Sequence, residues 1–238
     1  MSENDRDYLV STDWLAAHLG DSDLRIFDCT GSVYAGPNPG TPNPLAVGQT
    51  WATRAWWLLH HAGVDVAILD GGWFKWLTEG RPVSADAVEY DPTTFVVRKD
   101  VGRGLATKEH VLDAVHNGSA AIVDSLSPQS YNGEEDKQYG TFGTRRGHIT
   151  NAVNIYFASL VDADTGCFID RDRLQDRFRT SGLDAQGKVI TYCGGGIGAT
   201  MTGFGLKLAG NHDVAVYDAS MMEWNADPNL PMTDSSAV

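Results

Sequence analysis

The stretch VITYCGGGIGAT, residues 189–200, decides how this chain folds and where its chemistry lies. Its first four residues form the apolar, β-branched run that is typical of a buried strand. The residues from Ala199 onward are compatible with a helix. Cys193 therefore lies at the carboxyl end of a predicted strand, on the turn into a predicted helix. Open α/β sheets bind their ligands at this edge.

Four of the five residues after Cys193 are glycine. Glycine lacks a Cβ atom and adopts positive φ, so successive amides can turn inward at a helix N-terminus and form an anion-binding ring. A thiolate, a persulfide or an anionic substrate would be stabilised there. The simpler alternatives are a buried structural cysteine and a dinucleotide-binding glycine loop, which would leave the cysteine unexplained. We expect Cys193 to be the nucleophile. The expected substrate-binding residues of the loop are Gly194, Gly195, Gly196, Ile197 and Gly198.

Short apolar runs alternate with helical patterns along most of the chain. Such alternation predicts an α/β fold, in which a parallel sheet carries helices on both faces. The expected strands cover residues 24–28, 66–69, 120–123, 153–155, 189–192 and 214–217. The expected helices cover residues 12–19, 52–61, 108–117, 170–181 and 199–209.

An internal repeat divides the chain into two unequal copies. DVAILDGGWFKW at 65–76 aligns with DVAVYDASMMEW at 213–224, and this register places Ala46 opposite Cys193. The first copy then lacks about fifty residues, roughly two strand–helix units. We therefore predict a shortened, inactive domain at 1–97, a linker at 98–103 and a catalytic domain at 104–238.

Composition narrows the possible partners and the compartment. The net charge of −13 disfavours nucleic acid and anionic membranes as partners. Three cysteines without a disulfide-like pattern, and an N-terminus without signal-peptide features, favour a reduced cytoplasmic protein. No apolar run is long enough to span a membrane. The Cys and His spacings do not match a zinc site, and we expect neither a metal nor a cofactor.

The chain resembles the tandem-domain rhodanese (sulfurtransferase) family. The motifs that carry the resemblance are LVSTDWLAAHL at 9–19, ATRAWWLLHHAGVDVAILDGG at 52–72, RRGHITNAVNI at 145–155 and YCGGGIGAT at 192–200. The resemblance implies that Cys193 takes sulfur from a small donor, thiosulfate or a 3-mercaptopyruvate-like molecule, and becomes a persulfide. It implies a thiol or cyanide as the acceptor, and a thioredoxin-like reductant as a further partner.

Several residues depart from the family pattern. The loop carries no charge and is nearer in shape to the mercaptopyruvate type. Leu126 and Ser130 stand where relatives often carry arginine. Arg145 and Arg146 are then the candidates for binding a donor carboxylate, although a solvated pair is an equal alternative. His148, in a Gly-His-Ile turn, is interpreted as structural.

Two other functions remain open from the sequence. The chain could be a non-enzymatic persulfide carrier or binding module, because the usual donor-binding arginines are missing. A cysteine-loop phosphatase is less favoured, because that chemistry needs an arginine at the end of the loop and residues 194–200 contain none.

Overall fold

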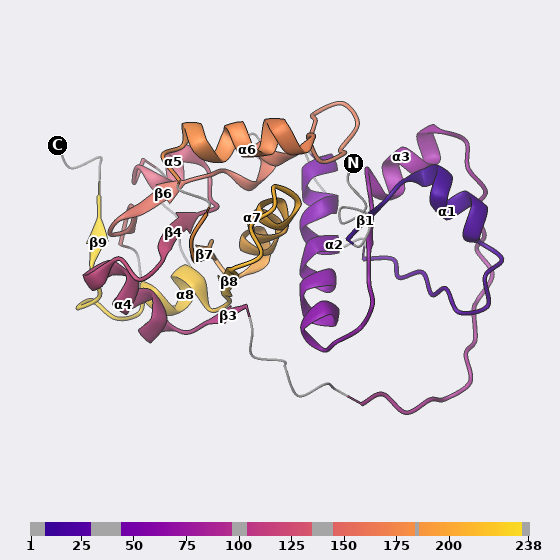
Figure 1. Ribbon diagram of the computed structural model, residues 1–238, viewed down its shortest axis with the longest axis horizontal. Helices are drawn as coiled ribbons and strands as arrows, with labels where there is room; N and C mark the ends of the chain where they lie inside the picture. The colour runs from indigo at the N-terminus through magenta and orange to yellow at the C-terminus, as the bar shows by residue number, and fades with distance from the viewer. Residues whose placement is uncertain (1–7, 30–43, 97–103, 135–144, 184–185, 235–238) are drawn as a thin grey trace.

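The computed structural model describes residues 8–29, 44–96, 104–134, 145–183 and 186–234. A five-stranded parallel sheet, ordered β3-β8-β7-β4-β6, organises the second half of the chain (Figure 1). Its middle strand is β7, so the residue that follows β7 lies at the centre of the sheet's carboxyl edge. The strands are β3 (Leu105–Ala106), β4 (Ala121–Asp124), β6 (Ala152–Asn154), β7 (Val189–Tyr192) and β8 (Val214–Tyr217).

Helices cover both faces of this sheet. Alternate strand residues point to opposite faces, so Val123 and Val189 pack into one buried cluster, while Ile122 and Ile190 pack into another. The first cluster includes residues of α6 (Arg171–Thr180) and α7 (Ile197–Leu208), and the second includes residues of α4 (Lys108–Asn117) and α8 (Ser220–Trp224). The remaining elements of this half are α5 (Pro128–Tyr131), η3 (Phe157–Leu160) and the antiparallel pair β5 (His148–Ile149) and β9 (Met232–Thr233).

The first part of the chain is held mainly by one long helix. α2 (Pro44–His61) lies beside α7 in Figure 1, and its Trp56 is 2% exposed, with its ring centroid 4.8 Å from that of Phe204. Trp56 therefore belongs to the core of the second half. The other elements are β1 (Leu9–Val10), α1 (Thr12–His18), β2 (Ile68–Leu69) and α3 (Gly72–Thr78), with β1 and β2 paired in parallel.

One expected strand is wrong. Residues 24–28 form no strand, and Ile26 and Phe27 are 57% and 66% exposed. In the second half, β7 lies between β4 and β8 and bonds to both. Among the described residues of the first part, no strand lies between residues 24–28 and β2, so this β-prone segment has no neighbour with which to form a ladder.

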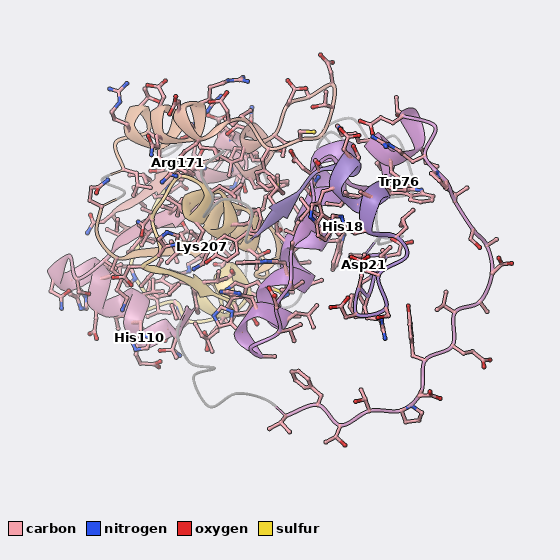
Figure 2. All side chains as sticks on the ribbon, turned by 45° about the vertical axis from the view of Figure 1, so that its right-hand side comes forward. His18, Asp21, Trp76, His110, Arg171 and Lys207 are labelled. Atoms are coloured by element: carbon pink, nitrogen blue, oxygen red, sulfur yellow. The ribbon has the colours of Figure 1, made fainter. Side chains whose placement is uncertain are left out.

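The segment after α3 is largely exposed, although the Arg25 guanidinium lies 4.7 Å from the centroid of its Tyr90 ring. Figure 2 shows the segment following a wide arc away from the rest of the molecule. Val88 and Val96 are 69% and 76% exposed. The expected linker at 98–103 lies outside the described residues.

The predicted α/β class is confirmed, with a central parallel sheet between layers of helices. Strands 189–192 and 214–217 and helix 108–117 have the expected bounds. α2 begins eight residues earlier than expected, at Pro44, while β2 is only two residues long. None of the helices in the described ranges combines the length and apolar character needed to cross a bilayer.

Candidate active site

Cys193 lies between the end of β7 and the beginning of α7 and is 4% exposed. The first residues of α8 form hydrogen bonds with its backbone N–H and carbonyl groups and with the next carbonyl. The Cys193 N–H donates to Ser220 Oγ at 3.1 Å, and the Cys193 carbonyl accepts from the Met221 amide at 3.0 Å. The Gly194 carbonyl accepts from the Met222 amide, also at 3.0 Å. The position of the thiol is therefore set by two adjacent strand–helix turns.

Ser220 adopts an unusual backbone conformation to make this contact. Its φ is 53°, in the left-handed region that few residues other than glycine occupy. Gly72, the matching residue of the first repeat, has φ 58°. The second repeat thus accepts a strained serine where the first uses glycine, and gains a hydroxyl that fixes the Cys193 amide. Only the comparison of the two repeats could have drawn attention to Ser220 in the sequence.

The loop after Cys193 offers amides that the protein does not use. Within the described part of the chain, no acceptor takes the backbone N–H of Gly194, Gly195, Gly196 or Ile197. Gly196 is the N-cap of α7 and has φ 82°. Unpaired N–H groups at the N-terminus of a twelve-residue helix favour an anion. These are properties that the glycine pattern predicts for an anion-binding loop.

Ser125 is a second hydroxyl beside the cysteine. Asp124 pairs with Tyr192 across β4 and β7, and the Ser125 amide donates to the Tyr192 carbonyl at 2.9 Å. The register therefore places Ser125 next to Cys193. Ser125 is fully buried, and its Oγ has no hydrogen-bond partner among the described residues. A buried hydroxyl normally has a partner, so this one is available to a ligand. In the sequence, this region stands out only for its lack of arginine at Leu126 and Ser130.

Arg145 has several hydrogen-bond partners within the fold. Its guanidinium donates to the carbonyls of Leu230, Trp224 and Asp227 at 2.7–2.9 Å, and its Nε lies 3.3 Å from Asn225 Oδ1. These bonds tie together the turn that follows α8. The guanidinium is thus occupied inside the fold, which favours a structural role over binding of a donor carboxylate. Arg146 is exposed on the surface.

The side chains of His148 and Asp70 make contacts within the fold. His148 Nδ1 lies 2.8 Å from the Tyr131 carbonyl, and the two rings stack at 3.7 Å. Asp70 Oδ1 accepts from the Phe168 amide at 2.9 Å. Burial and the nearby Asp70 raise the pKa of the Cys167 thiol, which disfavours the reactive thiolate. The described residues contain no group of His, Cys, Asp and Glu side chains suited to a metal ion.

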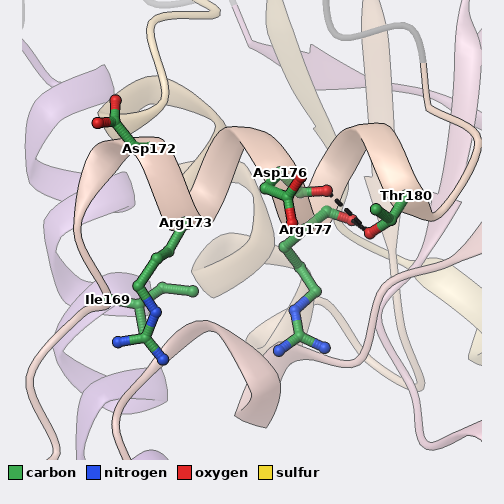
Figure 3. Close-up of a pocket in the computed structure, with 6 residues that line it drawn as sticks. All are labelled: Ile169, Asp172, Arg173, Asp176, Arg177 and Thr180. Atoms are coloured by element: carbon green, nitrogen blue, oxygen red, sulfur yellow. Dashed lines mark hydrogen bonds between the residues drawn. The ribbon is translucent and has the colours of Figure 1, made fainter.

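A pocket of about 490 Å³ lies on α6, away from the cysteine loop (Figure 3). Arg173 and Arg177 extend from the same side of the helix there. No residue of the cysteine loop lines it, so we do not include it in the site. The lining residues are Ile169, Asp172, Arg173, Asp176, Arg177 and Thr180.

Comparison with known proteins places these features in a family. The family model of the Rhodanese-like domain matches residues 107–227 of this chain. The chain is 31% identical over 191 residues to a thiosulfate sulfurtransferase of Gallus gallus, covering 79% of this chain and 64% of that protein. It is 28% identical to the sulfur carrier protein TtuD of Thermus thermophilus, covering 94% of this chain and 95% of that protein.

Solved structures show the same fold. The crystal structure of SseA from Escherichia coli, a 3-mercaptopyruvate sulfotransferase, has a TM-score of 0.67 and 24% identity, covering 90% of this chain and 98% of that chain. EanB in complex with ergothioneine has a TM-score of 0.71 and 21% identity, covering 82% of this chain and 48% of that chain. The chain thus spans a little under two thirds of the Gallus gallus relative and about half of EanB.

Proposed function

The chain belongs to the rhodanese-like domain family, and we propose that it is a sulfurtransferase that works through a persulfide on Cys193. The donor is a small anion, thiosulfate or a 3-mercaptopyruvate-like molecule, and the acceptor is a thiol or cyanide. The observation that carries this proposal is the set of unpaired amides at residues 194–197, which directly follow the thiol-bearing Cys193 at the end of β7. Unpaired amides at a helix N-terminus favour the binding of an anionic donor next to the thiol.

Sulfur transfer through Cys193 takes place in two half-reactions. The Cys193 thiolate attacks the outer sulfur of the donor, and an S–S bond forms as the donor's bond to that sulfur breaks. The bonding electrons leave on sulfite from thiosulfate, or on the enolate of pyruvate, which then takes a proton. The acceptor attacks the outer sulfur of the persulfide, and the Cys193 thiolate leaves with the electrons.

Two serines support this cycle from opposite sides of the cysteine. Ser220 fixes the Cys193 amide, so the sulfur keeps its place when its charge changes. Ser125 has an unused hydroxyl in a buried position next to Cys193. We assign it a hydrogen bond to the persulfide or to the bound donor. Such a bond to a charged group is stronger than one between neutral partners.

We further propose that residues 1–97 are a shortened copy of residues 104–238 and that this copy covers the active site. The matching φ values of Gly72 and Ser220, and the direct packing of α2 on α7, support the duplication. The cysteine has no counterpart in the first copy, where Ala46 takes its place. Residues 1–97 then pack against the half that carries the cysteine loop and supply no nucleophile of their own.

A sulfur carrier is the second candidate. The similarity to TtuD extends over 94% of this chain and 95% of that protein. A carrier would accept sulfur on Cys193 and release it only to a protein partner. It would therefore form a stable persulfide with little turnover toward small acceptors.

Intact mass spectrometry tests the proposal. The protein is incubated with thiosulfate or with 3-mercaptopyruvate, and cyanide or a small thiol is then added. A gain of one sulfur on the peptide that contains Cys193, lost on adding the acceptor, supports the transferase and identifies the donor. A gain that small acceptors do not remove favours the carrier. Absence of loading by either donor contradicts the sulfurtransferase proposal.

A further inference from the structure

Arg54 places a positive charge beside the cysteine loop, although it comes from α2 in the other half of the chain. Its Nη1 forms an ion pair with Asp218 Oδ1. Asp218 follows β8 and flanks the glycine turn: a Cβ built on Gly196 would lie 2.5 Å from Asp218 Oδ1 and 3.3 Å from Arg54 Nη1. The guanidinium also lies over the Trp57 ring, 5.6 Å from its centroid. Arg54 is thus oriented from two sides and reaches Gly196.

Among the described residues, neither the cysteine loop nor Arg145 supplies a free cation for an anionic donor. Residues 194–200 carry no charge, and Arg145 is occupied by the turn after α8. The side chain of Arg54 is 21% exposed. Among the described residues, no acceptor bonds to its Nε or Nη2, so these donors remain for a ligand.

The ion pair also compensates the negative charge of the Asp218 carboxylate. This carboxylate is 42% exposed and lies against the turn whose amides would bind an anion. Without Arg54, its negative charge would oppose an anion at the same place. Arg54 therefore contributes twice: it attracts the donor and neutralises the nearest carboxylate.

We propose that Arg54 determines the specificity of the site for anionic sulfur donors, binding the charged end of the donor above the Gly195–Gly196 turn while Asp218 and Trp57 hold it in place. The proposal rests on the proposed function of Cys193. It assigns to the first copy a residue that acts on substrate, so that the active site is formed by both halves of the chain.

Alkylation of Cys193 by two matched reagents measures the charge directly. Iodoacetate and iodoacetamide share a leaving group and differ by one negative charge. The rate of each is followed on the peptide that contains Cys193 in the full chain. In Arg54→Met, the ratio of iodoacetate rate to iodoacetamide rate is expected to fall about fivefold, the order expected for two unit charges about 4 Å apart in bulk water. Met occupies the matching position of α7, at residue 201, and is therefore a suitable replacement.

Three further variants complete the test. Arg54→Lys keeps the charge and should keep most of the ratio. Adding Asp218→Asn to Arg54→Met should restore part of the loss, because it removes the unmasked carboxylate. Arg179→Met, an exposed residue of α6, is the matched control and should change nothing. If both reagents slow equally in Arg54→Met, Arg54 only supports the fold and the inference is overturned.

The KM for thiosulfate, with cyanide as acceptor, gives a second reading. It is expected to rise at least about fivefold in Arg54→Met and to stay near wild type in Arg54→Lys. An unchanged KM in Arg54→Met contradicts the inference while leaving the sulfurtransferase proposal intact. If the wild-type protein loads no sulfur at all, the proposed function fails, and the alkylation ratio still decides whether Arg54 supplies charge to Cys193.

Discussion

Thr53 Oγ1 and Thr200 Oγ1 lie 3.3 Å apart where α2 crosses α7, and both residues are buried. They occupy matching positions in the two repeats, in the stretches WAT and GAT. Each hydroxyl also lies near the carbonyl three residues earlier, at 2.9 Å from Thr50 and 2.7 Å from Ile197. The two helices therefore meet through equivalent residues in equivalent local geometry. This contact joins the first part of the chain to the helix that begins at the cysteine loop.

Truncating the aromatic residue at this contact should destabilise the whole protein. Trp56 is 2% exposed, packs against Phe204, and donates from Nε1 to the Val66 carbonyl at 2.9 Å. Trp56→Ala should lower the free energy of unfolding by about 3–5 kcal/mol, measured by urea denaturation. Trp73 is 46% exposed, so Trp73→Ala should cost less than about 1 kcal/mol. Equal losses from the two variants would mean that α2 does not share the core of the second half.

A methyl group in the cysteine loop should block the site. Gly196 has φ 82°, and a Cβ there would lie 2.5 Å from Asp218 Oδ1. Gly196→Ala should therefore displace the turn and reduce the rate of sulfur loading by at least about tenfold, in line with the loss of oriented amide donors. Gly187→Ala is the control, because its Cβ would meet open space. Normal loading in Gly196→Ala would show that the turn does not shape the site.

Arg145 should contribute to stability and not to donor binding. Its guanidinium bonds to three carbonyls after α8. Arg145→Ala should lower the free energy of unfolding by about 1–3 kcal/mol, because buried acceptors lose their donors. The KM for either donor should stay unchanged. Arg146→Ala, at an exposed position, should change stability by less than about 0.5 kcal/mol. A raised donor KM with normal stability in Arg145→Ala would restore the substrate-binding role that the sequence suggested.

His148 should make stability depend on pH. Burial lowers its pKa below the ordinary value of 6.5. The unfolded chain therefore protonates this histidine at a higher pH than the folded protein does. The contribution of neutral His148 to the free energy of unfolding is complete above pH 6.5 and is lost as the pH falls toward the folded pKa. The free energy of unfolding should decline between pH 7 and pH 5 more steeply in wild type than in His148→Gln. His212→Gln, at an exposed position, should retain the wild-type slope. Identical slopes in wild type and His148→Gln would contradict this account.

The second half of the chain could be predicted well from its sequence because its local patterns agree with their surroundings. The run at 189–192 becomes a central strand with neighbours on both sides, as its apolar composition requires. The same type of run at 24–28 forms no strand, because the described residues of the first repeat include no neighbouring strand with which it could pair. A run of strand-forming residues does not show whether the chain also supplies the neighbouring strand with which it would pair.

The site shows a similar division. Cys193 and its glycines could be found in the sequence because a thiol and unpaired amides lie within a few consecutive residues. The sequence of the loop itself does not indicate Ser125, Ser220 or Arg54, because register and helix packing bring them to the loop from distant segments. The charge of Arg145 makes it a candidate for donor binding in the sequence. In the structure, its guanidinium forms hydrogen bonds with carbonyls about 80 residues later in the chain.

Sulfur loading of Cys193→Ser tests the central claim most directly. Cys193→Ser and Cys167→Ser are each incubated with the donor that loads the wild-type protein, and peptide mass spectrometry locates the added sulfur. We expect wild type and Cys167→Ser to gain one sulfur at residue 193. Cys193→Ser should gain none while unfolding at the same urea concentration as wild type. Undiminished loading of Cys193→Ser, or loading that disappears in Cys167→Ser, would show that the cysteine loop is not the site of sulfur transfer.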